Sequence, residues 1–274
     1  MSKEISELKG VSETLLIPLV ARYRETKSDH GILSDEESVR VLDSLGLDAS
    51  KVSQSPIDSA GACLRTLIID DFVNRFIRDN PEGIIVNCGC GLDTRFSRLD
   101  NGRIRWFDID LPNVIELRKR VFEEIPRRCF ISGSVLESEW IKAIPKAGKT
   151  LFVMEGLLIY FSEEEVKRFF LNIKDHFPDA ELVIHTFSAF MVRASKFTAG
   201  RGGLRKKAVD MVQWGIASGL EIEEWFPGIA LVEETNVVDR DRSRFPLAFR
   251  ILWRIFPGLA NMSKIIHLRM SGIS

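Results

Sequence analysis

The chain has 274 residues, which is long enough to bury a large hydrophobic core in one domain with an insertion or cap. Its 38 basic and 39 acidic side chains nearly cancel, whereas a general nucleic-acid-binding protein normally carries a strong basic excess. No apolar run reaches about 18 residues and none follows a basic start, so we expect neither a membrane span nor a signal peptide.

The four cysteines, Cys63, Cys88, Cys90 and Cys129, are not spaced as a disulfide framework. Cys88 and Cys90 flank a glycine, and no histidine stands near them to complete a metal site. The sequence therefore predicts a cytoplasmic protein with reduced thiols and without a bound metal.

Residues 1–60 precede the first predicted strand and contain two predicted helices. Apolar residues at helical spacing predict the first helix at residues 15–25. The second is expected at residues 35–45, with Ser34 as its N-cap. Residues 46–60 are rich in serine and aspartate, so we expect a loop there that acts as the hinge of a lid.

A longer helix is predicted from Gly61 to Asn80, because apolar residues recur there at helical spacing and a proline follows. The next apolar run, Ile84 to Val86, is short and β-branched, which is typical of a buried strand.

Gly89 and Gly91 follow this strand, and glycine lets the backbone turn sharply and lets a ligand lie against bare peptide. A second strand, expected at residues 104–109, leads to Asp108 and Asp110, about 20 residues after the glycines. Carboxylates at that position can accept hydrogen bonds from ribose hydroxyls. The stretch therefore predicts a nucleoside cofactor bound to a parallel α/β sheet.

The residues after the glycines bear on which cofactor this is. A dinucleotide-binding turn needs a third small residue, and here that position is Thr94, preceded by Asp93. The charge of Asp93 would oppose a pyrophosphate but not a cofactor with a sulfonium and an amino group. This favours S-adenosylmethionine over NAD. An NAD-linked oxidoreductase and a non-catalytic cofactor-binding protein remain as alternatives.

Further strands and helices are expected along the rest of the chain. The strands are expected at residues 128–131, 150–155, 181–186, 229–238 and 264–270, and the helices at 113–125, 162–177, 204–218 and 246–256. Ser162 and Glu165 predict a capping box. The basic run that includes Arg118 is expected to face solvent, and residues 200–203 are expected to form a loop.

The helix expected at residues 246–256 is strongly amphipathic and carries Arg250 and Arg254. We expect it to pack on the sheet while its arginines extend to solvent. A membrane-surface helix is the alternative interpretation.

The long stretch VNCGCGLDTRFSRLDNGRIRWFDIDLPNVIELRKR and the later MEGLLIY resemble the leucine carboxyl methyltransferase and tetracenomycin-type O-methyltransferase family, a branch of the class I methyltransferases. The resemblance runs from about Thr14 to the C-terminus. It implies a doubly wound, mostly parallel seven-stranded sheet in the order 3-2-1-4-5-7-6, with an antiparallel last strand. It also implies a helical cap at residues 1–60 and a methyltransferase domain at residues 61–274.

The function that the resemblance implies is methyl transfer from S-adenosylmethionine to a phenol or carboxylate of a small molecule. A protein C-terminal carboxylate is the alternative acceptor. The resemblance places Arg65 against the methionine carboxylate and Glu155 near the amino group. Among the two acids, it favours Asp110 over Asp108 as the ribose ligand.

Adenine and the acceptor are assigned to two other parts of the chain. The resemblance places the turn that contains Val135 and Leu136 around adenine. Tyr160 is one of only two tyrosines and is the best candidate for contacting a substrate oxygen. His185 stands at the end of a predicted strand that faces the expected pocket, so either His185 or Tyr160 with a neighbour is the candidate base for a phenol acceptor.

Overall fold

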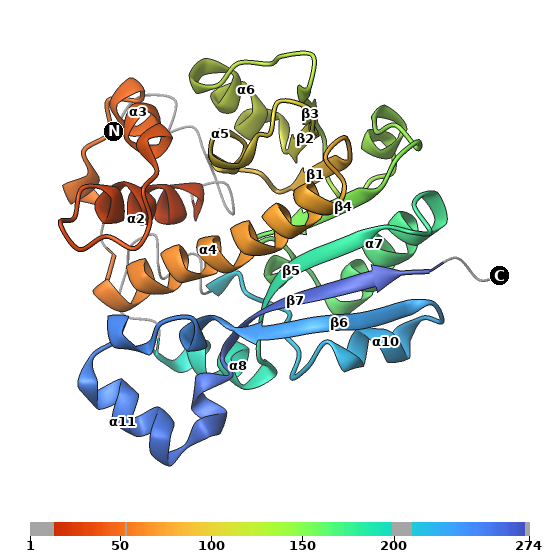
Figure 1. The fold of residues 1–274 in the computed structure, drawn as a ribbon. Coiled ribbons are helices and arrows are strands. Elements are labelled where there is room, and N and C mark those ends of the chain that lie inside the picture. Colours follow the sequence, from red (N-terminus) through yellow and green to blue (C-terminus); the bar gives the residue numbers. More distant parts are fainter. Residues whose placement is uncertain (1–13, 53, 199–209, 272–274) are drawn as a thin grey trace.

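The computed structural model describes residues 14–52, 54–198 and 210–271. A seven-stranded sheet runs through its centre (Figure 1). Its strands are β1 (Ile84–Cys88), β2 (Arg105–Asp110), β3 (Arg128–Ser132), β4 (Thr150–Met154), β5 (Glu181–Phe187), β6 (Ile229–Asn236) and β7 (Ser263–Met270). The order is β3-β2-β1-β4-β5-β7-β6, and β7 runs antiparallel to both β5 and β6. The predicted strand order and the antiparallel last strand are both confirmed.

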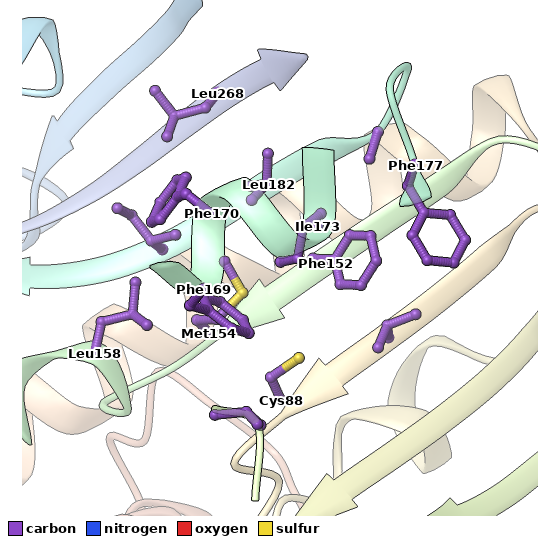
Figure 2. Packing of buried hydrophobic residues seen from close by; sticks show 14 of the residues in the cluster. Cys88, Phe152, Met154, Leu158, Phe169, Phe170, Ile173, Phe177, Leu182 and Leu268 are labelled. Carbon is purple, nitrogen blue, oxygen red and sulfur yellow. The ribbon is translucent and has the colours of Figure 1, made fainter. Parts of the chain in front are cut away.

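Alternate residues of the central strands enter two separate hydrophobic cores, because successive side chains of a strand point to opposite faces. One face packs against the helix α7 (Glu163–His176), as Figure 2 shows, through Cys88, Phe152, Met154, Phe169, Phe170 and Ile173. The other face packs against the helix α4 (Pro56–Asp79) through Ile85, Leu151, Val153, Phe72, Val73 and Phe76. Burial on both faces explains why β1 and β4 are mostly apolar, with Ile84–Val86 and Leu151–Met154 as their apolar runs.

Most of the predicted helices are present, whereas the helices at residues 189–198 and 220–225 were not predicted. The helices are α2 (Leu16–Thr26), α3 (Glu36–Ser44), α4, α5 (Arg95–Leu99), α6 (Pro112–Val121), α7, α8 (Ala189–Thr198), α10 (Leu220–Trp225) and α11 (Leu247–Ile255). The capping box of α7 is confirmed, since Ser162 and the side chain of Glu165 each accept from the other's backbone N–H.

Three local predictions were wrong. Asp35, not Ser34, caps α3, because its carboxylate accepts from the backbone of Ser38. The helix α4 begins at Pro56, capped by Ser55, so residues 56–60 are helical and are not part of a loop. Of the helix expected at residues 204–218, the described residues 211–218 are not helical. Its first part and the expected loop at residues 200–203 lie outside the described residues.

The N-terminal helices are packed into the rest of the fold. Leu19 of α2 and Val41 of α3 share a hydrophobic cluster with Leu92 and with Ile115 of α6. The boundary expected between residues 60 and 61 falls inside α4, which is one continuous helix. An ion pair joins Glu25 of α2 to Arg244, 219 positions further along the chain. The expected cap is therefore built on a core that it shares with the methyltransferase domain.

The helix α11 does not pack on the sheet as expected. Trp253 is its one buried residue, and most of its apolar side chains are exposed. Figure 1 shows α11 projecting from the same side of the sheet as the N-terminal helices.

Candidate active site

A cavity of about 520 Å³ lies at the carboxyl ends of the parallel strands. These ends are where α/β proteins of this kind bind ligands, next to the point where the strand order reverses. One end of the cavity is lined by the glycine turn after β1, by Asp110 after β2 and by Glu155 after β4. The other end is lined by residues of β5, α8 and the segment around α11. The N-terminal residues Leu15 and Pro18 contribute a further wall.

The glycine turn has the backbone conformation that only glycine adopts without strain. Gly89 and Gly91 have φ angles of +66° and +46°. A Cβ at Gly89 would lie 2.8 Å from the side chain of Leu157, which leaves no room for a larger residue. The turn thus presents bare backbone to the cavity, as predicted.

Asp110 lies beside this turn and in the cavity wall. Its Oδ2 accepts from the backbone N–H of Gly91 at 2.8 Å, and its Oδ1 accepts from that of Leu111 at 2.7 Å. Burial nevertheless raises the pKa of Asp110 above its usual value, and the two backbone donors oppose that shift. An acid oriented in this way, at the end of β2, suits a pair of ribose hydroxyls.

Asp108 does not reach the cavity, so its assignment as a cofactor ligand was wrong. Its side chain is fully buried and accepts from Asn87, Trp106, Arg118 and Arg128. With four donors around it, Asp108 holds the centre of a structural network.

Arg118 is buried as well, contrary to the expectation that it faces solvent. Besides Asp108, it donates to the carbonyl oxygens of Gly91 and Asp93, at 2.8 and 3.0 Å. Arg118 therefore links Asp108 to the glycine turn, and its two bonds to carbonyl oxygens hold the backbone of that turn in place.

Asp93 lies in the cavity wall but its charge is already matched. Its Oδ2 accepts from Arg95 Nη1 at 2.6 Å and from Asn87 at 3.2 Å. Burial alone would raise the pKa of Asp93, but the charges of Arg95, Arg22 and Arg98 together outweigh burial and lower it. Asp93 is thus ionised and anchored, which fits a cofactor without phosphates.

Arg65 and Glu155 form an ion pair at the cavity wall, with Arg65 Nε 2.8 Å from Glu155 Oε1. The other oxygen of Glu155 accepts from Arg95 at 2.5 Å. Burial would raise the pKa of Glu155, but the two arginines outweigh it and hold the carboxyl far below its usual range. The pair offers one positive and one negative group at the same place.

Arg95 is a site residue that the sequence analysis missed. It is fully buried and binds three carboxylates, those of Asp70, Asp93 and Glu155. The G-L-D-T-R string contains both Arg95 and Asp93, but the other two partners, Asp70 and Glu155, lie 25 and 60 positions away from Arg95. No local spacing could have identified them.

The turn after β3 contributes less than expected. Val135 is in the cavity wall together with Gly133 and Ser134, as predicted. Leu136 is not among the lining residues, and its backbone N–H donates to Ser134 Oγ at 3.3 Å. The assignment of Leu136 as a cofactor contact was therefore wrong.

Tyr160 and His185 both line the cavity, and the charge of Arg65 acts on both side chains. The Tyr160 hydroxyl is 3.4 Å from Thr14 Oγ1, and burial raises its pKa. His185 Nε2 is 3.0 Å from Ser263 Oγ, while its Nδ1 has no hydrogen-bond partner among the described residues. Burial, reinforced by the charge of Arg65, keeps the pKa of His185 well below 6.5, so the ring is neutral near pH 7.

The neighbouring wall is apolar and includes Phe187, Met191, Val238, Phe245, Phe249, Trp253 and Met262. The indole N–H of Trp253 is a second buried polar group without a partner among the described residues. Such groups cost stability unless a ligand or water satisfies them, so this end is built to receive polar atoms on an apolar molecule.

The cysteines and possible metal ligands add no further site. All four cysteines are free, and burial raises the pKa of Cys63 to about 12. Within residues 14–52, 54–198 and 210–271, no three His, Cys, Asp or Glu side chains converge as metal ligands. In the same ranges, no helix is both long enough and apolar enough to span a membrane.

Comparison with protein families decides the identity of the fold and cofactor. The model of the leucine carboxyl methyltransferase family matches residues 19–174, which is more than half of the chain. The chain belongs to the leucine carboxyl methyltransferase family. It is therefore an S-adenosylmethionine-dependent methyltransferase, and the NAD alternative falls.

Two methyltransferases with related sequences show how similar this chain is to other proteins. The tetracenomycin polyketide synthesis O-methyltransferase TcmP of Streptomyces glaucescens is 27% identical over 237 residues, which cover 86% of each chain. An S-adenosyl-L-methionine-dependent methyltransferase, dpfgK of Gibberella zeae, is 28% identical over 190 residues, or 63% of each chain.

Solved structures share the fold at low sequence identity. The magnesium protoporphyrin IX methyltransferase of Synechocystis PCC 6803, with bound S-adenosylhomocysteine, is 11% identical with a TM-score of 0.52. It is covered over 94% of its chain and 86% of this one. The plantazolicin methyltransferase BpumL, also with S-adenosylhomocysteine, is 11% identical with a TM-score of 0.51 and is matched over its full length and 99% of this chain.

Proposed function

We propose that this methyltransferase methylates an oxygen atom of a small, largely apolar organic molecule. The observation that supports this most is the acceptor end of the cavity, where apolar walls surround Tyr160, His185 and Trp253. The similarity to TcmP, an O-methyltransferase of tetracenomycin polyketide synthesis, agrees with an oxygen acceptor.

The residues of the other end fit the cofactor. The Arg65–Glu155 pair matches the carboxylate and ammonium of the methionine moiety, since each charged group finds a partner of opposite sign. Asp110 would accept from the ribose hydroxyls, and Val135 would contact adenine. Gly89 and Gly91 let the backbone approach closely. Asp93, which Arg95 holds in place, forms part of the wall at this end of the site.

The bound cofactor supplies an activated methyl group on a sulfonium, so the protein mainly has to align the acceptor oxygen with it. The apolar side chains around Phe187 and Met262 exclude water from that line. Tyr160 and Trp253 can donate to the acceptor oxygen or its neighbour.

The need for a base depends on the acceptor. A carboxylate is ionised at pH 7 and needs none, whereas a phenol must lose a proton. His185 is neutral and lines the cavity, and its buried Nδ1 has no hydrogen-bond partner among the described residues, so we assign it the role of accepting that proton. Its Nε2–H would then donate to Ser263 Oγ and fix the tautomer.

A small molecule fits this cavity better than a protein C-terminus. The walls come from the N-terminal helix α2, from α4 and from the segment around α11, so they enclose the acceptor end from several sides. We propose that residues 12–60 act as a cap over the site and that closure around a small acceptor excludes water.

The test is turnover with S-adenosylmethionine labelled on its methyl group and a panel of phenols and carboxylic acids. We expect label in a product that is an ether or an ester, and mild alkali separates the two because it cleaves esters only. Label found on nitrogen or carbon would overturn oxygen methylation.

The two tyrosines provide a matched pair of variants. Tyr160→Phe should lower turnover without changing the affinity for S-adenosylhomocysteine, because the hydroxyl that it removes contacts Thr14 and the proposed acceptor but not the groups assigned to the cofactor. Tyr23→Phe, in the N-terminal helix, should leave both unchanged. Equal turnover in the two variants would remove Tyr160 from the acceptor site.

A further inference from the structure

The helix α11 exposes an apolar face that no described residue covers. Leu247, Ile251 and Ile255 are 65%, 50% and 63% exposed. They follow one another at intervals of four residues and therefore form a single stripe along the helix. Leu252 and Phe256 widen the stripe and are 38% and 57% exposed. Isolated surface leucines are ordinary, but a contiguous stripe of this kind marks an interaction surface.

Positive charge flanks the stripe. Arg250 and Arg254 are exposed on α11, and neither makes a salt bridge with a described residue. The segment 242–263 contains four arginines and no acidic residue. Two of the four are engaged elsewhere, Arg242 with Asp239 and Arg244 with Glu25. Asp241 lies just before the segment, and its pKa is lowered mainly by a hydrogen bond from Ser243 and to a smaller extent by the charge of Arg250.

We propose that α11 is an interfacial helix that docks on a membrane surface with anionic headgroups. An apolar face with arginines beside it is the pattern that places a helix at the boundary between headgroups and acyl chains. The arginines would contact lipid phosphates while Leu247, Ile251 and Ile255 enter the apolar layer.

A second copy of the chain fits this surface less well. A nine-residue helix is about 14 Å long and about 10 Å wide, so one face of it covers only about 140 Å². Each partner of a stable dimer buries roughly 800 Å². A twofold dimer would also bring the same basic patch of each chain together, and like charges disfavour that contact.

The opposite face of α11 belongs to the cavity. Phe249 and Trp253 line the acceptor end, so docking would place that end directly beside the lipid surface. The inference stands on the exposed face and its charge, and it does not depend on which atom of the acceptor is methylated.

The experiment is sedimentation of the full chain with vesicles made of phosphatidylglycerol and phosphatidylcholine in equal parts, or of phosphatidylcholine alone. We expect binding to the anionic vesicles that is about tenfold or more stronger than binding to the neutral ones and that weakens at high salt. If the intact chain does not sediment with either kind of vesicle, the proposal is overturned.

Two variants separate docking from folding. Ile251→Glu combined with Ile255→Glu should weaken vesicle binding about tenfold or more, with unchanged stabilisation by S-adenosylhomocysteine. Leu171→Glu, at an apolar residue of α7 that is 39% exposed, is the matched control and should bind vesicles normally. Equal binding of both variants would contradict the proposal. So would a wild-type dimer that the α11 variant splits, because a second copy would then cover the stripe.

Discussion

Arg65 and Glu155 face each other at the cavity wall although 90 positions of sequence separate them, and Arg65 Nε lies 2.8 Å from Glu155 Oε1. Their side chains are 17% and 12% exposed, so both can still be reached by a ligand. A zwitterion that binds between them gives its carboxylate to the arginine and its ammonium to the glutamate. The net charge of the site stays the same, and no charge is left without a partner.

Replacing Arg65 should weaken cofactor binding and leave the fold intact. Arg65→Ala removes a charged hydrogen bond worth roughly 1.5–3 kcal/mol, which corresponds to an affinity about 10- to 150-fold lower. Glu155 keeps its bond to Arg95, so it is not left unpaired. Isothermal titration with S-adenosylhomocysteine measures the change. Arg78→Ala, at an exposed arginine in the last turn of the same helix, is the control, and similar affinities for both variants would refute the assignment.

The two acids of β2 should respond in opposite ways to neutralisation. Asp108→Asn leaves Arg118 and Arg128 without their buried counter-charge and should lower the free energy of unfolding by about 3–5 kcal/mol. Asp110→Asn should change stability little but weaken S-adenosylhomocysteine binding about tenfold or more. Urea denaturation and titration give both quantities for each variant. Wild-type affinity in Asp110→Asn would show that this acid does not hold the ribose.

Asp35 should be as important for stability as any residue of the central sheet. Its buried Oδ2 accepts from Arg22 at 2.9 Å, Thr94 at 2.6 Å and Arg98 at 2.9 Å. Asp35→Ala leaves the buried Arg22 without its counter-charge and takes from Arg98 one of its two carboxylate partners, the other being Asp70, so it should cost about 3–5 kcal/mol of unfolding free energy. Asp48→Ala removes the exposed N-cap of a short helical turn in the same region and should cost about 1 kcal/mol. Equal losses would mean that the N-terminal helices are only loosely attached.

His185 should make stability depend on pH below 6.5. The folded protein keeps this ring neutral, since burial holds its pKa well below 6.5, whereas the unfolded chain takes up a proton near that value. The contribution is therefore present above pH 6.5 and is lost as the pH falls, by up to about 1.4 kcal/mol per pH unit. His185→Asn should flatten this slope, as measured by urea denaturation about one pH unit above and below 6.5. His30→Asn, at an exposed histidine, should keep the wild-type slope.

Much of the fold could be predicted because the relevant signals are local. The strand β1 shows itself as a β-branched run, and the glycine turn follows from residue type alone. The capping box of α7 involves two residues three positions apart. Helix ends were harder, because Ser34 and Asp35 are both good caps and only the backbone conformation decides between them.

Residues of the cavity wall could be predicted only where the position of a residue along a strand determines whether its side chain reaches the cavity. Asp110 is the last residue of β2 and Glu155 directly follows β4, so both reach the cavity. Asp108 and Arg118 looked like a ligand and a solvent-exposed residue, yet they form a buried pair with a separation of 2.8 Å. Whether a charged side chain is buried depends on its partner, and here the four donors to Asp108 come from three strands and a helix.

The ion pair between Glu25 and Arg244 has a consequence for anyone who recombines this enzyme with a relative to change its acceptor. One wall of the cavity comes from residues 14–22 and another from residues 237–263, and this pair joins the two segments. A chimera that takes only one of the two segments sets the carboxylate of Glu25, which is 8% exposed, against an unrelated side chain. The two segments therefore form one transferable unit, and a productive crossover has to exchange both at once.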